Sequence, residues 1–543
     1  MDFQRLFLFL IFSFSLMMVW DGWQRYQHPE LVAQSETAPA KSDSPASNKA
    51  VTDQTLTAKQ LVVAESGKII KIKTDVIEAE INTTGGNIQH LDLLKHPDAL
   101  DKNKGVILFD KGEGKNTYIA QSGLLGSEMP NHNTLFTASQ DNYQLQDNEN
   151  QVQIKMLAVS SSGVQVAKIF TFHKGSYVID ISYEISNSSK AEVKTSAYFQ
   201  FIRGNEAPEG DSKMVPTYTG PAVYTEQEKF QKVAFGDIDK NKIPYPKESD
   251  NGWIGMLQHY FVAAWIPSEK TNREYFTRKL EGGLYSAGVV VPVSAIAPGK
   301  ATVVDMRLYA GPAQSKLNKI APGLGLSVDY GWLTILATPI FWMLTFLEGI
   351  VKNWGVAIIL LTVMIKLAFF PLSAASYRSM GKMRAVAPKL EKIKQQYGDD
   401  RERLNKAMME LYKTEKINPL GGCLPMLIQI PVFIALYWSI LASVEMRYAP
   451  FFGWITDLSK ADPYYILPLI MGASMFLQSK LNPVPPDPIQ AKVMQIMPVA
   501  FSVVFFFFPA GLVLYSIVNN VLSIAQQWYI TREIGVEGAT AKR

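Results

Sequence analysis

Long apolar runs with very few charges constrain this chain of 543 residues more than any other feature. A membrane span needs about 20 mostly apolar residues. The runs long enough are Leu6 to Trp23, Trp354 to Leu372, Leu420 to Val444 and Val493 to Ile530. The last is long enough for two spans and is broken by Pro509-Ala510-Gly511, and a shorter run covers Tyr464 to Ser479. The sequence therefore predicts an α-helical polytopic membrane protein with six spans.

The first apolar run, within residues 1–23, is predicted to be an uncleaved transmembrane anchor. A cleaved signal peptide is the alternative, because Arg5 precedes the run and Ala38-Pro39-Ala40 resembles a cleavage site. That site lies 18 residues past Trp20, too far from the apolar run. Bulky residues 17–20 also fill the place where cleavage needs small side chains. An uncleaved anchor keeps the N-terminus in the cytoplasm.

The charges of the short loops set the predicted orientation, because Lys and Arg accumulate in cytoplasmic loops. Residues 373–419 hold 11 Lys and Arg against 6 Asp and Glu, whereas residues 445–463 hold 2 against 3. The loop 373–419 is therefore predicted to be cytoplasmic. With six spans, both termini are then cytoplasmic, and the region from residue 24 to about 330 is exported.

One further apolar segment, Tyr330 to Leu347, contains no charge and is the candidate for a seventh span. Counting it as a span would move the basic loop to the outside. Its large apolar residues recur at three- and four-residue steps, as in an amphipathic helix that lies in the membrane interface. Residues 326–350 are therefore predicted to form an interfacial helix, followed by a five-span core over residues 351–543.

The exported region divides by composition. Residues 24–58 are rich in Ser, Ala, Pro and Lys and are predicted to be a disordered tether. In residues 59–325, several segments alternate apolar and polar residues between turn-forming residues, as in KIIKIKTDVIEAEI (68–81) and GVQVAKIFTFHKGSYVIDISYEIS (163–186). This alternation predicts antiparallel strands, and the expected fold is an exported all-β sandwich.

The sequence contains no recognisable pattern for catalysis or for a bound metal. His90, His96 and His173 are candidates for acid and base, but no spacing brings them together, so they are predicted to be scattered surface residues. The HExxH, GxSxG and phosphate-binding glycine motifs are missing from the sequence. Cys423 is the only cysteine, which excludes an intrachain disulfide and a cysteine metal cluster. We expect no enzyme activity, no cofactor and no metal site.

Residues 373–419 predict a cytoplasmic helical hairpin, because apolar stripes at helical spacing flank Gly398-Asp399-Asp400, a turn followed by a helix cap. One interpretation is that the two helices pack on each other with a solvated charged rim. The other is docking, because methionine-rich faces adapt to varied surfaces and positive charge attracts RNA or anionic lipid headgroups. The candidate docking residues are Met380, Met383, Arg384, Leu390, Met408 and Leu411.

Lys366 is the one charged residue in the run from Trp354 to Leu372. A charge near the bilayer centre costs roughly 2.5 to 3.5 kcal/mol on insertion scales. Lys366 lies six residues from Leu372, or about 9 Å from the cytoplasmic end, so one explanation is snorkelling of its ammonium group to the headgroups. The other is a hydrated groove. Its candidate residues are Lys366, Thr362, Gln429, Tyr515, Ser516, Asn519, Asn520 and Ser523.

The five later spans contain no Asp or Glu. Coupled transporters and proton relays usually need an intramembrane carboxylate or histidine, so transport is disfavoured. An unpaired cation in a wet pocket would instead attract acidic residues of a passing peptide and lower the cost of moving its polar tail into the membrane.

Several strings resemble the YidC family of bacterial membrane protein insertases, which is related to the Oxa and Alb insertases of organelles. They are INTTGGNI (81–88), GLSVDYGWL (325–333), NWGVAI (353–358), INPLGGCLPMLIQIP (417–431), DPYYILP (462–468) and FPAGLVLY (508–515). The resemblance covers nearly the whole chain. It implies the Gram-negative form of the family, whose large periplasmic domain is a β-supersandwich.

The resemblance also implies function and partners. The expected activity is insertion and folding of nascent inner-membrane proteins in the lipid bilayer, alone or with the Sec translocon, with ribosome and targeting factors at the cytoplasmic hairpin. No small-molecule substrate is expected. The family groove usually carries an arginine where this chain has Lys366, which retains the charge but not the planar fork of five donors. The alternative functions are a small-solute or lipid transporter that uses Lys366 as an anion site and, third, a scaffold of the secretion machinery.

The topology is testable by cysteine labelling. Because the basic loop 373–419 is predicted to be cytoplasmic, a membrane-impermeant thiol reagent should fail to label cysteines introduced near residue 400 in intact cells. Cysteines introduced in the exported domain should be labelled in the same cells. Efficient labelling near residue 400 from outside would refute the predicted orientation.

Overall fold

The computed structural model describes residues 67–540, apart from 99–100, 127, 207, 209–217, 269, 329, 331–332, 399, 416–423 and 482–487. The predicted anchor 1–23 and tether 24–58 lie outside the described residues. The chain divides into two compact units. The first ends with the last strand at Pro312 and takes in Lys316–Gly325, and the second runs from Leu326.

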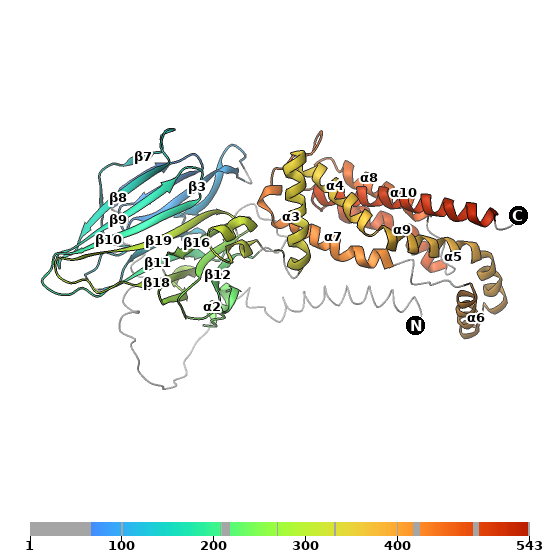
Figure 1. Cartoon of the computed structure of the whole chain (residues 1–543), viewed down its shortest axis with the longest axis horizontal. Coiled ribbons are helices and arrows are strands. Elements are labelled where there is room, and N and C mark those ends of the chain that lie inside the picture. The colour runs from blue at the N-terminus through green and yellow to red at the C-terminus, as the bar shows by residue number, and fades with distance from the viewer. Residues whose placement is uncertain are drawn as a thin grey trace, which may run out of the picture. The chain divides into compact units, whose positions relative to one another are not determined.

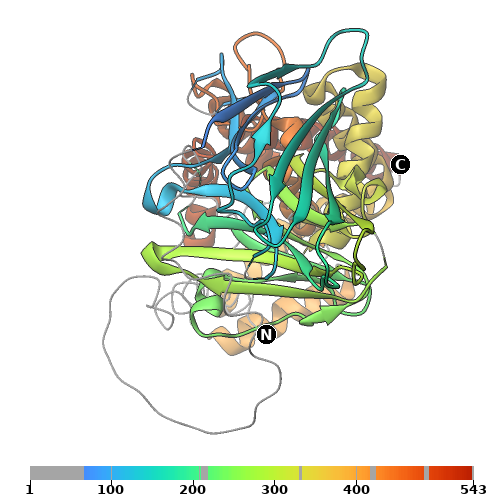
Figure 2. The ribbon, with the colours of Figure 1, turned by 90° about the vertical axis from the view of Figure 1, so that its left-hand side faces the viewer.

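The first unit contains two β-sheets (Figures 1 and 2). The ten-stranded sheet has the order β14 (Glu248–Ser249), β17 (Arg273–Lys279), β18 (Leu284–Pro292), β11 (Ser196–Gly204), β5 (Tyr118–Leu124), β4 (Gly105–Asp110), β3 (Asn87–Pro97), β2 (Ile77–Asn82), β1 (Ile69–Lys73), β7 (Asn142–Gln144). The nine-stranded sheet has the order β13 (Lys229–Lys232), β12 (Gly220–Thr225), β15 (Trp253–Gln258), β16 (Phe261–Pro267), β19 (Ala301–Pro312), β10 (Val178–Asn187), β9 (Val164–His173), β8 (Gln151–Val159), β6 (Thr137–Ala138). The predicted sandwich is confirmed.

Alternation of side chains builds the core between the sheets. In β10, Ile179, Ile181 and Tyr183 are buried, and the residues between them face outward. Aromatic side chains then cross from sheet to sheet, since the Trp265 ring of β16 lies 5.4 Å from the Phe199 ring of β11. Each such buried side chain contributes about 1.5 to 3 kcal/mol of hydrophobic stabilisation.

A buried lysine also joins the two sheets. Lys168 of β9 is 0% exposed, and its amine donates to the carbonyl oxygens of Gly85 (2.8 Å), Gly86 (2.9 Å) and Ser122 (3.4 Å) on the ten-stranded sheet. Burial lowers the pKa of Lys168 well below its usual value, but three carbonyls match the three donors of an ammonium group. Gly85 and Gly86 both have positive φ, which suits glycine in this turn.

One further histidine of the sandwich, His132, is not a surface residue. It is buried beside Tyr198, whose hydroxyl contacts both its ring Nδ1 and its backbone N–H. Burial, followed by the charge of Lys168, lowers the pKa of His132 to about 4. His132 is therefore neutral at physiological pH and belongs to the interior of the sandwich.

The second unit is helical (Figure 1). Its helices are α3 (Thr334–Val351), α4 (Trp354–Ala368), α5 (Phe370–Tyr397), α6 (Arg401–Thr414), α7 (Leu424–Ala442), α8 (Ile466–Leu481), α9 (Pro488–Phe505) and α10 (Ala510–Thr540). Buried residues of α3, α4, α7, α8 and α10 form one apolar cluster with the loop between α7 and α8. The predicted hairpin of two spans around Pro509 corresponds to α9 and α10.

The predicted number of six spans is not confirmed. By length and composition, α3 is the one described helix that could cross a membrane by itself, and α4 with Phe370–Met383 could do so as a bent pair. In Figure 1, α3 runs across the direction shared by α4, α7 and α10. Exposed Trp342, Phe346 and Ile350 cover its outer side, so it is apolar on its exposed side as well as on its buried side.

The predicted second span is bent. Helix α4 ends at Ala368, and the chain turns by 66° before α5 continues. Pro371 lies in the first turn of α5, where its missing N–H is tolerated. Lys366 therefore lies in the last turn of α4 rather than inside a straight helix.

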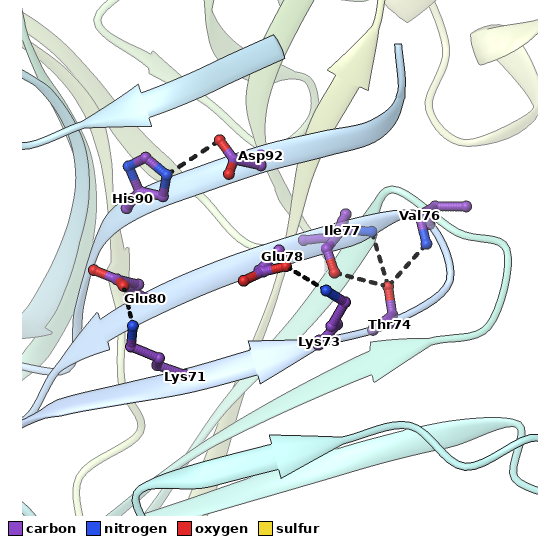
Figure 3. Close-up of polar contacts among 9 residues, drawn as sticks. All are labelled: Lys71, Lys73, Thr74, Val76, Ile77, Glu78, Glu80, His90 and Asp92. Atoms are coloured by element: carbon purple, nitrogen blue, oxygen red, sulfur yellow. Dashed lines mark hydrogen bonds and ion pairs between the residues drawn. The ribbon is translucent and has the colours of Figure 1, made fainter. Parts of the chain in front are cut away.

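The outer face of β1, β2 and β3 carries an ordered set of charges (Figure 3). Lys71 pairs with Glu80 (3.3 Å), and Lys73 pairs with Glu78 (2.8 Å). The Nε2 atom of His90 lies 3.1 Å from the Asp92 carboxylate, and its Nδ1 atom lies 3.9 Å from that of Asp110. The contact with Asp92, followed by the charges of Asp92, Glu80 and Asp110, raises the pKa of His90 despite partial burial.

His90 should make the sandwich more stable at mildly acidic pH. Its pKa is higher in the folded chain than the value of about 6.5 in unfolded peptides, so its stabilisation is fully present below about pH 6.5 and is lost as the pH rises through the folded pKa. We expect His90→Gln to lower the thermal unfolding temperature of the full-length protein at about pH 6 and to have little effect at about pH 8.5.

Lys71→Gln is the matched control for this experiment. It changes the same charged row but removes a group that does not titrate in this pH range. Its effect should be equal at the two pH values. An equal effect of His90→Gln at both values would show that its titration does not contribute to stability.

Candidate functional site

The candidate site is built around Lys366. Asn353 caps the start of α4 by accepting the Val356 N–H (3.0 Å), and Lys366 follows in the last turn of the helix. A cation there interacts favourably with the unpaired carbonyls at the helix end. Lys366 is 8% exposed, and its amine donates to the hydroxyl oxygen of Ser523 on α10 at 2.7 Å.

Ser523 is oriented as an acceptor for this amine. Its hydroxyl donates to the carbonyl oxygen of Asn519 (2.7 Å), which leaves its lone pairs for Lys366. Tyr377 of α5 also contacts the Ser523 hydroxyl. Among the described residues, Ser523 is the one hydrogen-bond partner found for Lys366. An ammonium group has three donors, so two remain available for water or a ligand.

A second polar cluster joins α7 to α10. The Gln429 side-chain amide donates to the Asn519 side-chain oxygen and lies 3.5 Å from the Tyr515 hydroxyl. Gln429 therefore contacts two other predicted groove residues, Tyr515 and Asn519. Asn519 links this cluster to Lys366, because its backbone carbonyl accepts the Ser523 hydroxyl.

The other predicted groove residues have different partners. Thr362 and Ser516 donate to carbonyls of their own helices, those of Ile358 (2.7 Å) and Leu512 (2.9 Å). Asn520 donates to the Ser474 hydroxyl of α8 (3.1 Å). The structure thus brings Lys366 and Ser523 together, and Gln429, Tyr515 and Asn519 together, but places Thr362, Ser516 and Asn520 outside these two contacts.

Sequence reasoning did not single out Tyr377 or Ser474. The sequence does carry an indication of Ser474, since it is a polar residue within the apolar run from Tyr464 to Ser479. The indication of Tyr377 is weaker. Tyr377 follows Pro371 by six residues, and its approach to Ser523 depends on the bend between α4 and α5.

The chemistry of the site is that of electrostatic attraction and hydrogen bonding. No ion pair of Lys366 with a carboxylate occurs in the part of the chain that the structure describes. The described residues also contain no group of three or more His, Cys, Asp or Glu side chains that could hold a metal. The site offers one cation, amides and hydroxyls among apolar helices, which suits a polar or anionic peptide segment.

The predicted cytoplasmic hairpin is formed by α5 and α6. The Asp400 carboxylate caps α6 by accepting the N–H groups of Glu402 and Arg403 (3.2 and 3.1 Å). Val386 and Leu390 form a small core with four further side chains, which are Met383, Met408, Leu411 and Tyr412. Most of the predicted docking residues thus pack inside the hairpin. Met380 is half-buried outside this core, and Met409 is 52% exposed.

The comparisons with known proteins cover both units. Residues 69–343 match the family described as the YidC periplasmic domain, and residues 346–537 match the family described as the 60Kd inner membrane protein. A solved structure described as an active YidC insertase with its first transmembrane domain resolved has 18% identity and a TM-score of 0.40, and the match covers 87% of this chain and 96% of that one.

Curated relatives match over their full length. The "Membrane protein insertase YidC" of Nitrosospira multiformis is 54% identical over 563 residues, which cover 100% of this chain and 98% of the relative. The protein of the same name from Methylobacillus flagellatus is 52% identical over 555 residues, which cover 100% of this chain and 99% of the relative.

Proposed function

Because this chain belongs to the YidC family of membrane protein insertases, we propose that Lys366 and the polar side chains around it form the intramembrane groove that receives a substrate. The protein is an inner-membrane insertase with a periplasmic β-sandwich domain, and its substrates are inner-membrane proteins. The proposal concerns how its residues carry out that activity.

The main support for this proposal is the position of the Lys366 amine. A snorkelling lysine extends its stem so that the ammonium reaches the headgroups. The amine of Lys366 instead donates to Ser523 on a neighbouring helix and is largely buried. This contact offsets part of the desolvation cost and holds the cation inside the bundle. Its two remaining donors are available to a carboxylate or backbone carbonyl of the substrate.

The physical effect of the groove is a lower barrier for the polar part of a substrate. A polar tail that crosses apolar lipid loses its hydration, at a cost of several kcal/mol for each unsatisfied group. The Lys366 ammonium, the Ser523 hydroxyl and the Gln429 amide replace part of that hydration. A lysine attracts carboxylates as a point charge and does not require the bidentate geometry of arginine.

We also propose the finer topology and partners. Both termini and the hairpin are cytoplasmic, α3 lies in the exported interface, and the remaining helices form a five-span core. Ribosomes and targeting factors dock at the hairpin, and the Sec translocon acts with the insertase. The net positive charge of residues 373–419, with 11 basic against 6 acidic side chains, supports contact with ribosomal RNA or anionic lipid.

The charge of Lys366 should matter more than its shape. Lys366→Arg should be tolerated, Lys366→Ala should reduce insertion of a substrate with an acidic tail about five- to thirtyfold, for an attraction of about 1 to 2 kcal/mol, and Lys366→Glu should be worst. A substrate with a neutral tail should be affected less. The measurement is translocation of both substrates and complementation of a depletion strain, with expression checked for each variant.

Lys480→Leu is a matched control for a lysine at a helix end. Lys480 lies in the last turn of α8, as Lys366 does in α4, but it is exposed and its amine lies 5.1 Å from the Phe476 ring centre. Lys480→Leu should leave the preference for acidic tails unchanged. Full activity of Lys366→Leu on both substrates would refute the proposal that Lys366 acts as a groove cation. Equal defects of Lys366→Leu on both substrates would refute the proposed pairing of Lys366 with the substrate tail.

The hairpin prediction separates docking from self-packing. Because Met409 is exposed and Met380 lies outside the hairpin core, Met380→Asn with Met409→Asn should impair insertion of ribosome-delivered substrates while the hairpin stays resistant to limited proteolysis. Met383→Asn with Met408→Asn should reduce that resistance, because both side chains pack on the core. If the first pair has no effect on insertion, the methionines serve only self-packing.

A further inference from the structure

The loop between α7 and α8, residues 443–465, is packed into the helical unit rather than exposed as a simple connection. Met446 and Leu458 are fully buried in the apolar cluster that includes α4, α7 and α10. Asp462 is only 1% exposed. A carboxylate buried among apolar side chains is costly unless hydrogen bonds satisfy it, so its partners indicate what this loop does.

The Asp462 carboxylate fixes the start of α8. Its Oδ1 accepts the indole N–H of Trp454 (2.9 Å) and the backbone N–H of Tyr464 (3.0 Å). Its Oδ2 accepts the backbone N–H of Leu467 (2.7 Å), the second residue of α8. The first N–H groups of a helix have no partner within it, and a negative charge there is favoured by the helix dipole.

The same loop segment forms hydrogen bonds with the start of α10. The Ala510 N–H donates to the Lys460 carbonyl (2.7 Å), and the Gly511 N–H donates to the Leu458 carbonyl (3.0 Å). A side chain at position 511 would place its Cβ 3.2 Å from the Leu458 oxygen and 3.3 Å from the Ile358 Cδ1 atom of α4. Glycine thus allows α10 to approach the loop and α4 closely.

The two helices then stay in contact along the bundle. Asn520 of α10 donates to Ser474 of α8 (3.1 Å), and Gln527 donates to the Leu481 carbonyl (3.0 Å). A shift of one residue along a helix is about 1.5 Å of rise with a rotation of about 100°. Such a shift of α10 would separate Ser523 from Lys366, whose contact is 2.7 Å.

We infer that Asp462 is a positioning residue for the groove: by holding residues 458–462 against the starts of α8 and α10, it sets the register that keeps Ser523 at Lys366. This inference rests on the proposed function of Lys366. Asp462 lies on the loop that begins α8 and does not itself contact Lys366. It acts through the backbone carbonyls of Leu458 and Lys460.

The first test measures register without reference to Lys366. In a full-length Cys423→Ser background, Ser474→Cys with Asn520→Cys places two thiols where side chains already touch. We expect mild oxidation in membranes to form this disulfide efficiently and Asp462→Ala to reduce it severalfold, with Asp462→Asn intermediate because an amide has only one acceptor oxygen. Unchanged disulfide formation in Asp462→Ala would overturn the inference.

The matched control is Asp457→Asn. Asp457 is the other buried acidic side chain of this loop, but its hydrogen bonds within the described residues are to the N–H (2.9 Å) and hydroxyl (2.6 Å) of Ser459. No hydrogen bond joins it to the start of either helix in that part of the chain. Asp457→Asn should leave disulfide formation unchanged, and an equal loss in both variants would show a general structural role instead.

The second test links register to the groove. In a depletion strain, Asp462→Ala should reduce insertion of an acidic-tailed substrate more than that of a neutral-tailed one, and adding Lys366→Ala should cause no further loss. Equal defects on both substrates, additive with Lys366→Ala, would overturn the link to the groove. If Lys366→Ala itself shows no preference, the proposed groove cation fails, while the disulfide result still decides whether Asp462 positions α8 and α10.

Discussion

Within the described residues, one hydrogen bond holds the buried cation of the helical unit, from the Lys366 amine to the Ser523 hydroxyl. A cation among apolar helices must recover part of its lost hydration from protein groups. Ser523 can supply an acceptor only if α10 has the right register, and the starts of α10 and α8 are held by one short segment of the loop between α7 and α8. The hydrogen bond of Lys366 is therefore linked to the packing at the starts of α8 and α10.

Lys168 and Lys366 are both buried lysines, but their surroundings differ. Lys168 is fully buried, and three carbonyl oxygens accept from its three donors, so nothing is left for a ligand. Lys366 is also largely buried, but among the described residues it has one acceptor. The first joins two sheets of the periplasmic domain. The second has two donors left, which the proposed function assigns to a substrate peptide.

The hairpin shows where a sequence pattern has two meanings. The apolar stripes of α5 and α6 correctly predict helices, and Asp400 is the cap that the sequence indicates. The same stripes do not show whether a helix face packs on the neighbouring helix or binds a partner protein, because both cases require apolar side chains at the same spacing. Packing around Leu390 assigns Met383 and Met408 to the hairpin core and leaves Met409 exposed.

The sequence alone determined the features that depend on local order. Alternation predicted strands such as β10, apolar runs predicted the helical unit, and the single charge in its run identified Lys366. Tertiary structure decided the partners. Lys366 and Ser523 are 157 residues apart, and Lys168 and Gly85 are 83 residues apart. The bend after Ala368 and the burial of His132 and Asp462 likewise follow from packing. The physical reason is that periodicity fixes which face of an element is apolar, whereas the partner of a polar side chain depends on the register between elements distant in the chain.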